Sequence, residues 1–326
     1  MKATAVAPSN IAFIKYWGKK DKNLRLPANT SISMNLSNAF TTTTVEFSAD
    51  NKKDEIYFGE KRMDRKSSIR VISHLDRIRR IAKKNLFAKV VTQNSFPQST
   101  GIASSASGFA ALTLAAVGAM DLKCSEKDLS ILARLGSGSA CRSIPCGFVE
   151  WKVSKTSENS YSFSLYDEKH WDLKDIIAVV STEEKKTSST LGHENAKSSP
   201  LFSKRLEHLP ARIVKLKEAL KEKNIKKLGE LIEKEAIELH MIMMTQDPPL
   251  FYWDGSTMEI VKLVRLWRND GLLVYFTLDA GPNVHLICES KEENKVLEKL
   301  KKLSYIKNVI INSPSSGARL IDKHLF

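Results

Sequence analysis

The stretch that decides the fold lies in the first third of the chain and reads Asn94-Ser-Phe-Pro-Gln-Ser-Thr-Gly101-Ile-Ala-Ser-Ser-Ala-Ser107-Gly108-Phe-Ala-Ala-Leu112. The β-prone run before it, 88–92, predicts a strand, and the apolar run 109–120 predicts a helix that begins near Ser104. Small residues between the two let the backbone approach a ligand closely. Because the first N–H groups of a helix lack intrahelical partners and carry partial positive charge, this loop is a candidate site for nucleotide phosphates.

The same stretch allows two other interpretations. Residues 102–120 carry no charged side chain, so by length alone they could cross a bilayer. They also hold four Ser or Thr residues and two glycines, which favours a buried helix in a globular protein. Alternatively, the Gly/Ser turn only caps the helix. It is not a Walker A loop, because no Gly-Lys-Ser/Thr follows Gly101.

The composition is ordinary for a folded chain. Its 326 residues, 42% hydrophobic and 27% charged, can form one large domain or two lobes. No signal peptide is evident. The four cysteines lack zinc-type spacing, and we expect them to be reduced, buried thiols of a cytoplasmic protein. They are Cys124, Cys141, Cys146 and Cys288.

The net charge of +14 raises the question of a polyanionic partner. The lysines alternate with glutamates in 205–227 and 291–302, which is typical of solvated helices. No nucleic-acid motif or aromatic platform accompanies them. We therefore expect a small anionic substrate and neither nucleic acid nor membrane as partner. A non-catalytic basic binding protein is the alternative from a different functional class.

Periodicity predicts an α+β chain. An amphipathic helix is expected at 65–82, with Ile69, Ile72, Leu75, Ile78 and Ala82 on one face. Another at 125–135 is capped by Ser125. The polar segment 182–199 is predicted to be a mobile surface segment. Strands are expected at 4–12, 41–48, 147–153, 161–165, 175–181, 271–278, 285–289 and 309–312, and further helices at 204–223, 225–243 and 292–303.

The quoted stretch resembles a known family. Pro97-x3-Gly101-Ile-Ala-Ser-Ser-Ala is similar to the phosphate loop of the GHMP superfamily of small-molecule kinases, and the longer run to Leu112 resembles its diphosphomevalonate decarboxylase branch. The resemblance implies a two-lobed GHMP kinase fold. A lobe like ribosomal protein S5 domain 2, at 1–180, would hold the ATP phosphate loop. A ferredoxin-like lobe, at 181–326, would hold a catalytic aspartate.

A second motif, Asn10-Ile-Ala-Phe-Ile-Lys15-Tyr16-Trp17-Gly18-Lys19, places two lysines near each other. In an extended segment both would face one side and could bind one anion, or they could be surface lysines of a strand edge. The motif resembles the unbroken family signature Asn-Ile-Ala-x-Ile-Lys-Tyr-Trp-Gly-Lys. That resemblance implies that Lys15 lies at the reaction centre, and that Tyr16 and Lys19 contact the phosphate end of the substrate.

A third motif, Gly136-Ser137-Gly138-Ser139-Ala-Cys-Arg142-Ser143, carries one fixed cation in a small-residue turn. Arginine forms bidentate hydrogen bonds with carboxylates, so Arg142 suits a substrate acid group, although it could instead pair with a surface acid. The motif is similar to the family pattern Gly-Ser-x-Ser-Ala-Cys-Arg-Ser. By resemblance, Ser137, Ser139 and Arg142 hold the mevalonate portion, and Ser189 is a further substrate ligand.

A fourth motif contains Asp279, at the end of the apolar run Tyr275-Phe-Thr-Leu-Asp279-Ala-Gly-Pro-Asn-Val284. Burial would raise the pKa of this carboxyl and neighbouring lysines would lower it. Alone, an Asp before Gly-Pro is common turn chemistry. The run resembles the family's Asp-Ala-Gly-Pro-Asn motif, which implies that Asp279 is the catalytic base for a tertiary hydroxyl that attacks phosphorus.

The resemblance also implies the cofactors, ATP and Mg²⁺. Its ATP-contacting positions are Thr92, Gly101, Ala103, Ser104, Ser105 and Ser107. Thr92 stands where we expect a serine. The metal ligands are not predicted. A homodimer is expected from the family, and 182–199 is expected to close over bound ATP.

One departure from the family pattern bears on the substrate. In Lys185-Lys-Thr-Ser-Ser189-Thr190, an expected phosphate-binding arginine is replaced by Thr190. We therefore expect ATP-dependent decarboxylation of mevalonate 5-diphosphate to isopentenyl diphosphate, with mevalonate 5-phosphate as the alternative substrate. A mevalonate 3-kinase is a third hypothesis, weakened because Asp279 is retained. The run 313–319 follows the expected glycine-rich pattern only loosely.

Overall fold

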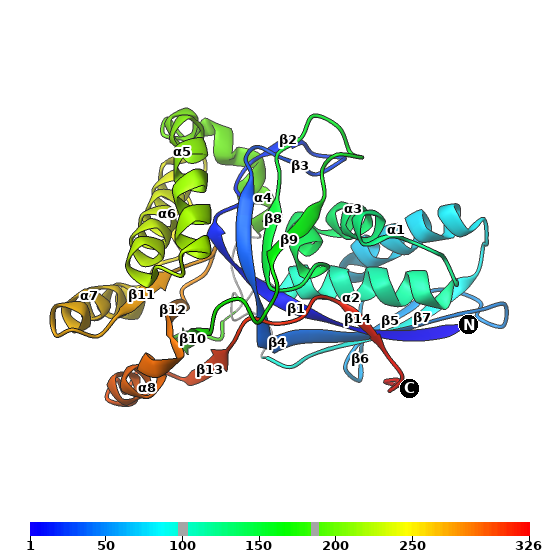
Figure 1. The fold of residues 1–326 in the computed structure, drawn as a ribbon. Helices are drawn as coiled ribbons and strands as arrows, with labels where there is room; N and C mark the ends of the chain where they lie inside the picture. The colour runs from blue at the N-terminus through cyan, green and yellow to red at the C-terminus, as the bar shows by residue number, and fades with distance from the viewer. Residues whose placement is uncertain (97–103, 184–188) are drawn as a thin grey trace.

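The computed structural model describes residues 1–96, 104–183 and 189–326, a mixed α+β molecule with two lobes (Figure 1). Its strands are β1 (Lys2–Ile14), β2 (Lys19–Asp21), β3 (Leu26–Pro27), β4 (Ser31–Ser48), β5 (Glu55–Phe58), β6 (Lys61–Arg62), β7 (Phe87–Asn94), β8 (Phe148–Trp151), β9 (Ser162–Tyr166), β10 (Leu173–Val179), β11 (Val274–Thr277), β12 (Val284–Glu289), β13 (Asn308–Asn312) and β14 (Arg319–Ile321). Its α-helices are α1 (Arg65–Ala82), α2 (Ser104–Ala119), α3 (Glu126–Gly136), α4 (Ser189–Asn195), α5 (Phe202–Lys221), α6 (Ile225–Thr245), α7 (Gly255–Asn269) and α8 (Glu293–Lys301). Three short 3₁₀ helices are η1 (Gly138–Ser143), η2 (Ala196–Ser198) and η3 (Ser290–Glu292).

The first lobe is built on an eight-stranded sheet. Its order is β14-β1-β4-β7-β5-β6, and β8 and β9 extend it beside β4. Helix α2 packs across β1 and β4 (Figure 1). The alanines of α2 at 110, 111, 115 and 116 are fully buried, and such small side chains let the helix approach the sheet closely. The uncharged run is thus a buried core helix.

No helix within the described ranges combines the length and the apolar content needed to span a membrane.

The second lobe is a four-stranded antiparallel sheet with helices on both faces. Its order is β11-β12-β10-β13. Successive side chains of a strand alternate between faces, so Val274 and Phe276 pack with Ile260 and Val264 of α7. Tyr275, between them in the sequence, faces the other way and lies against Gly229 of α6. The sheet therefore fixes the loop that follows β11, which carries Asp279.

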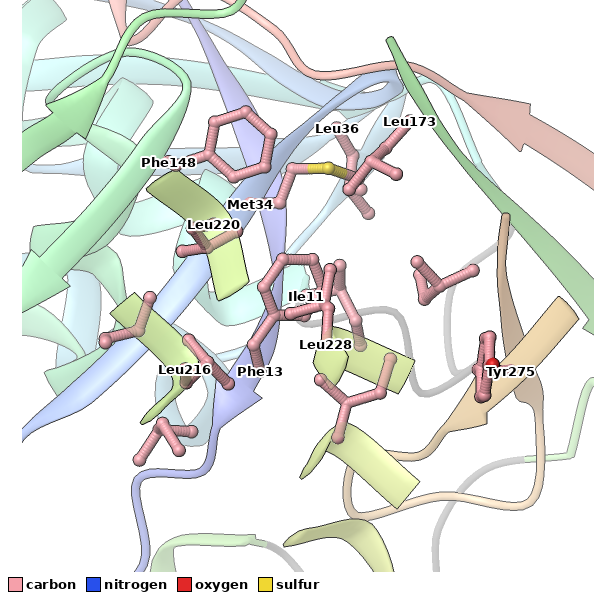
Figure 2. Close-up of a cluster of buried hydrophobic side chains, with 14 of the residues drawn as sticks. Ile11, Phe13, Met34, Leu36, Phe148, Leu173, Leu216, Leu220, Leu228 and Tyr275 are labelled. Atoms are coloured by element: carbon pink, nitrogen blue, oxygen red, sulfur yellow. The ribbon is translucent and has the colours of Figure 1, made fainter. Parts of the chain in front are cut away.

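The two lobes share a hydrophobic core (Figure 2). Ile11 and Phe13 from β1 are fully buried there with side chains from α5, α6 and the second sheet. The other labelled members of this cluster are Met34, Leu36, Phe148, Leu173, Leu216, Leu220, Leu228 and Tyr275. Because β1 ends beside this core, the residues that follow Ile14 emerge between the lobes.

The chain passes between the sheets more than once. Strand β10 belongs to the second sheet, and the chain later returns so that β14 pairs with β1, with Ala5 opposite Leu320. The returning segment is bonded to the first lobe, where Gly147 N–H donates to the Ser315 carbonyl at 2.8 Å. The predicted lobes at 1–180 and 181–326 stay a prediction; the structure adds that β14 lies in the sheet of the first lobe.

The predicted elements with strong local signals are confirmed. Helix α1 has the predicted bounds, and Asp64 caps it by accepting from the Ser67 N–H at 2.7 Å. Helix α3 begins after Ser125, which forms a capping box with Asp128. Asn224, expected between two helices, is the N-cap of α6.

Four expectations about local structure were wrong or incomplete. Ile69 does not face the core, because it is 55% exposed on α1. The predicted mobile surface segment 182–199, of which 184–188 lie outside the described residues, contains α4 and η2 and buries Ala196. Strand β4 begins at Ser31 and not near residue 41, because its first half pairs with β8. Of the cysteines, which are all unpaired, only Cys141 and Cys288 are buried; Cys124 and Cys146 are partly exposed.

Candidate active site

An ion pair between Lys15 and Asp279 joins the two lobes. Nζ of Lys15 lies 2.7 Å from Oδ1 of Asp279, and the two side chains are 2% and 26% exposed. Burial lowers the pKa of Lys15, and the nearby Asp279 opposes that effect. Burial would raise the pKa of Asp279, but Lys15, His285 and Arg142 together bring it below its usual value. Asp279 is therefore a carboxylate, able to accept a proton, with a cation in contact.

The loop that carries Asp279 is fixed by hydrogen bonds on both sides. The Asp279 carbonyl accepts from Nε2 of His240 at 3.1 Å. The Pro282 carbonyl accepts from the Thr257 hydroxyl at 2.6 Å. Oδ1 of Asn283 accepts from two backbone N–H groups at the end of β10, the nearer at 2.8 Å. The Asp-Ala-Gly-Pro-Asn motif thus holds its aspartate through main-chain contacts and ties it to the start of the segment 182–199.

Arg142 is a buried cation whose hydrogen-bond partners are neutral. It is 4% exposed and donates to Oδ1 of Asn10 and to the hydroxyls of Ser31 and Ser33, at 2.9–3.3 Å. Asn10 in turn donates to the Ser139 carbonyl at 3.4 Å. No carboxylate pairs with Arg142 within the ranges that the structure describes. An oriented guanidinium that makes no direct ion pair in the described structure is suited to an anionic ligand.

The residues after Lys15 pack against α4. The imidazole of His193 lies between the rings of Tyr16 and Trp17, with centroids 4.2 and 4.3 Å away. Its Nδ1 accepts from the Gly18 N–H at 3.1 Å. Gly18 has φ of +85°, the left-handed region that favours glycine. Burial and neighbouring cations hold the pKa of His193 well below its usual value, so the ring is neutral and carries its proton on Nε2.

Two polar groups of this segment are suited to bind a ligand. The Tyr16 hydroxyl is buried and has no hydrogen-bond partner among the described residues. Burial raises the pKa of Tyr16, so it stays a neutral donor. Lys19 is also buried, with Nζ 3.7 Å from Glu194 of α4. The two predicted lysines therefore have separate carboxylate neighbours, Asp279 for Lys15 and Glu194 for Lys19.

The start of α2 meets the third motif. Ser104 and Ser105 are exposed in the first turn of the helix. The hydroxyl of Ser105 lies 3.2 Å from that of Ser137, so the predicted phosphate loop and the predicted substrate turn adjoin. Ser107 differs, because it is fully buried and its hydroxyl lies 2.6 Å from that of Thr41. Its predicted role as an ATP ligand stays a prediction.

The other predicted ATP and substrate positions are placed only in part. Thr92 lies on β7, with its hydroxyl 2.9 Å from that of Thr43. Gly101 and Ala103 lie outside the described residues. Ser189 begins α4, and its side chain lies outside what the structure describes. The roles of these residues stay predictions.

The donor set around Asp279 bears on Mg²⁺. The described residues contain no group of three or more His, Cys, Asp or Glu side chains that could hold a metal ion. Mg²⁺ commonly uses one or two carboxylates together with substrate phosphates and waters. Asp279 supplies one carboxylate, which fits a cation that arrives with the phosphates of a nucleotide.

Sequence reasoning missed the residues that support the motifs. His193, Arg205, Glu235 and His240 belong to no motif, and all contact the first or fourth motif. A signal for Glu235 is present in the sequence: it stands among Ile232, Ala236 and Leu239, which predict the buried face of a helix. His193 offers no comparable signal.

Comparisons with known proteins agree with this geometry. Residues 7–162 match a family described as the diphosphomevalonate decarboxylase-like N-terminal domain, and residues 175–318 match the mevalonate 5-diphosphate decarboxylase C-terminal domain. A protein of Candida albicans named diphosphomevalonate decarboxylase is 35% identical over 317 residues, which cover 92% of this chain and 88% of the relative.

Two solved structures are similar over nearly their whole length. The crystal structure of mevalonate diphosphate decarboxylase from Staphylococcus aureus has a TM-score of 0.94 and 34% identity, and 98% of each chain is covered. A second structure, described as MDDEF in complex with MVAPP, AMPPCP and magnesium, has a TM-score of 0.93 and 35% identity, with 99% of each chain covered.

Proposed function

The chain belongs to the diphosphomevalonate decarboxylase family, and we infer from that membership that it catalyses the ATP-dependent decarboxylation of mevalonate 5-diphosphate. The products are isopentenyl diphosphate, ADP, phosphate and CO2, and the reaction belongs to the mevalonate pathway of isoprenoid biosynthesis. The proposed cofactors are ATP and Mg²⁺, and a similar structure holds MVAPP, AMPPCP and magnesium.

The observation that carries the proposed chemistry is the contact between Lys15 and Asp279. Asp279 accepts the proton of the C3 hydroxyl as that oxygen attacks the γ-phosphorus of ATP, and ADP leaves. The C3–O bond then breaks with its electron pair going to phosphate. The C1–C2 bonding electrons form the new double bond, and CO2 is released. Lys15 stabilises the negative charge that develops beside Asp279.

The substrate is held at both ends. Each terminal nitrogen of Arg142 carries two N–H donors. One of the two is used, by Ser31 on Nη1 and by Asn10 on Nη2. The remaining donor on each nitrogen is assigned to the C1 carboxylate. The Tyr16 hydroxyl and Lys19 are assigned to the phosphate end, with Ser189. Ser137 and Ser139 are assigned to the mevalonate portion between them.

ATP binding is assigned to the loop that precedes α2 and to its first turn. Unpaired N–H groups at a helix start and exposed hydroxyls at Ser104 and Ser105 suit phosphate oxygens. Gly101, Ala103, Ser107 and Thr92 complete the proposed set. Mg²⁺ would be held by the ATP phosphates with protein oxygens from this region, and it neutralises phosphate charge when bound.

Steady-state turnover tests this function. ADP and CO2 are measured with mevalonate, its 5-phosphate and its 5-diphosphate side by side. The highest kcat/KM with the diphosphate, and equal amounts of ADP and CO2, are expected. A preference for the monophosphate would overturn the substrate, and Thr190→Arg then tests whether the missing arginine causes it. ADP formation without CO2 would identify a 3-kinase.

The assembly and location are proposed separately. We propose a homodimer in the cytoplasm, following the expectation for this family and the prevalence of two-fold assemblies. Light scattering at several protein concentrations tests the dimer, and a constant monomer mass would refute it. Cell fractionation tests the location.

A further inference from the structure

Lys15 is bound through its backbone as well as through its side chain. It follows the last residue of β1, so its N–H and C=O lie beyond the sheet ladder. The N–H donates to Oε1 of Glu235 at 2.9 Å. The carbonyl accepts from Nη2 of Arg205 at 3.1 Å and from Nδ2 of Asn29 at 2.9 Å. Two of these three contacts come from helices of the second lobe, α6 and α5.

The groups that bind Lys15 form a buried charged network. Arg205 and Glu235 are fully buried and paired with each other. Arg212 contacts both Glu235 and Glu238, so two cations balance two carboxylates. Well-packed apolar residues of similar volume are often as stabilising as a buried ion pair. The need to hold a backbone N–H and C=O in place explains charged groups here better than stability does.

Helix α6 contacts both catalytic residues. Glu235 binds the N–H of Lys15, and one and a half turns later His240 binds the carbonyl of Asp279. One rigid helix therefore holds the main chain of both residues whose side chains meet at 2.7 Å. We propose that Glu235, backed by Arg205, and His240 are positioning residues that set the Lys15–Asp279 geometry from α6. The inference rests on the proposed function only in taking Lys15 and Asp279 as the reacting pair.

Two double variants isolate the contact to Lys15. Each replaces both members of the Arg205–Glu235 ion pair by neutral residues, so the net charge of the protein is unchanged. The first combines Arg205→Met with Glu235→Gln, and the second combines Arg205→Met with Glu235→Leu. Gln keeps an oxygen for the Lys15 N–H, whereas Leu of similar size does not. Arg212 keeps Glu238 as its partner in both. We expect kcat of the Leu variant to be about tenfold to hundredfold below that of the Gln variant. The reason is that a small displacement of a catalytic side chain such as Lys15 lowers the rate of the chemical step by up to about a hundredfold. KM values for ATP and substrate should change little, since Arg142 and Lys19 are untouched.

The pH profile separates positioning from loss of stability. The charged groups that act on the Asp279 carboxyl are Lys15, His285 and Arg142. A displaced Lys15 no longer lowers the pKa of Asp279 as strongly, so the acidic limb of kcat should move to higher pH in the Leu variant. A merely structural role would lower Tm without moving that limb.

Glu233 provides a matched control on the same helix. It is also a shielded carboxylate, 12% exposed, that pairs with Arg268 and accepts a backbone N–H, that of Phe276 at 3.1 Å. It contacts neither Lys15 nor Asp279 in the described structure. Glu233→Gln should lower Tm while leaving kcat and its pH profile unchanged.

The outcomes are distinct. Lack of turnover in the unmodified protein refutes the proposed function and not the positioning. If the unmodified protein is active, and the Gln and Leu variants have the same kcat and the same acidic limb in their pH profiles, the proposed positioning role of Glu235 is overturned. If the Leu variant does not fold, the second contact from α6 decides, because His240→Phe removes the donor to the Asp279 carbonyl whereas His240→Gln keeps one. An acidic limb shifted to higher pH in the Phe variant alone supports the inference, and equal limbs in the two variants overturn it.

Discussion

The indole of Trp17 lies directly against Gly192, so that a Cβ atom at residue 192 would stand 2.6 Å from Cζ2 of the ring. The ring cannot retreat easily, because its Nε1 donates to Oε1 of Gln246 at 3.2 Å. Close contact between α4 and the segment after Lys15 therefore depends on the absence of a side chain at this position.

Gly192→Ala should displace α4 and, with it, His193 and Glu194 from Tyr16 and Lys19. Overpacking costs about 1–3 kcal/mol, so we expect KM for the phosphorylated substrate to rise about tenfold, with KM for ATP nearly unchanged. Gly255→Ala is the control, since a Cβ there meets no atom within 4 Å. Equal KM values for the two variants would contradict this account of Gly192.

Asp279→Asn should abolish both product-forming steps together. The amide cannot accept the proton of the C3 hydroxyl, so ADP and CO2 formation should both fall by about 10²–10⁴. Nucleotide binding, followed by calorimetry, should remain. Continued ADP formation with loss of CO2 alone would show that Asp279 acts after phosphoryl transfer and not before it.

Lys15→Met should shift the pH dependence of the remaining activity. Lys15 lowers the pKa of Asp279, whereas burial raises it, so removal of the ammonium raises that pKa. Because the protonated carboxyl cannot act as a base, the acidic limb of kcat/KM should move to higher pH. The profile is measured on both proteins with the same buffers. An unchanged limb would argue that the two side chains are not coupled.

Arg142→Lys should raise KM for the substrate, because an ammonium cannot offer two parallel N–H donors to a carboxylate. A loss of about 1.5–3 kcal/mol for a hydrogen bond to a charged group corresponds to roughly tenfold to hundredfold in kcat/KM. Arg134→Lys is the matched control, since Arg134 is fully buried but donates to the carbonyls of Ser157 and Ser160. Similar kcat/KM for both variants would refute the proposed role.

The closing motion predicted for 182–199 is accessible to amide exchange. We expect slower exchange of the backbone N–H groups of α4 and η2 when an ATP analogue and the substrate are both bound. Exchange is measured with each ligand alone and with both. Equal rates in all states would refute closure.

Local signals account for the elements that were predicted correctly. Asp64, Ser125 and Asn224 each mark a helix start, and periodic apolar residues follow them. Helix α7 carries the same kind of signal, with an Asp254 cap and apolar residues near Val264, and was predictable. Strand β14 was not, because three residues at a sheet edge are defined by their partner β1 and not by their own sequence.

The residues of the site also fall into those that the sequence identifies and those that only the fold identifies. Lys15, Arg142 and Asp279 lie in motifs with distinctive spacing, so a resemblance identifies them and the structure brings Lys15 and Asp279 into contact. Glu235 and Arg205 lie in charged amphipathic helices, where most charged residues face solvent. Their burial follows from how α5 and α6 dock against the end of β1, which no local pattern specifies.

The return of the chain through β14 has a consequence for biosynthesis. Strand β1 has one neighbour, β4, within its own half of the sequence, and among the described residues the strand that pairs with its other edge is β14. Growing chains fold from the N-terminal side, so this edge stays uncovered on the ribosome until the whole second lobe has been translated. An uncovered edge strand invites pairing with other chains. Between the synthesis of β1 and that of β14, this edge of β1 is therefore open to pairing with other chains.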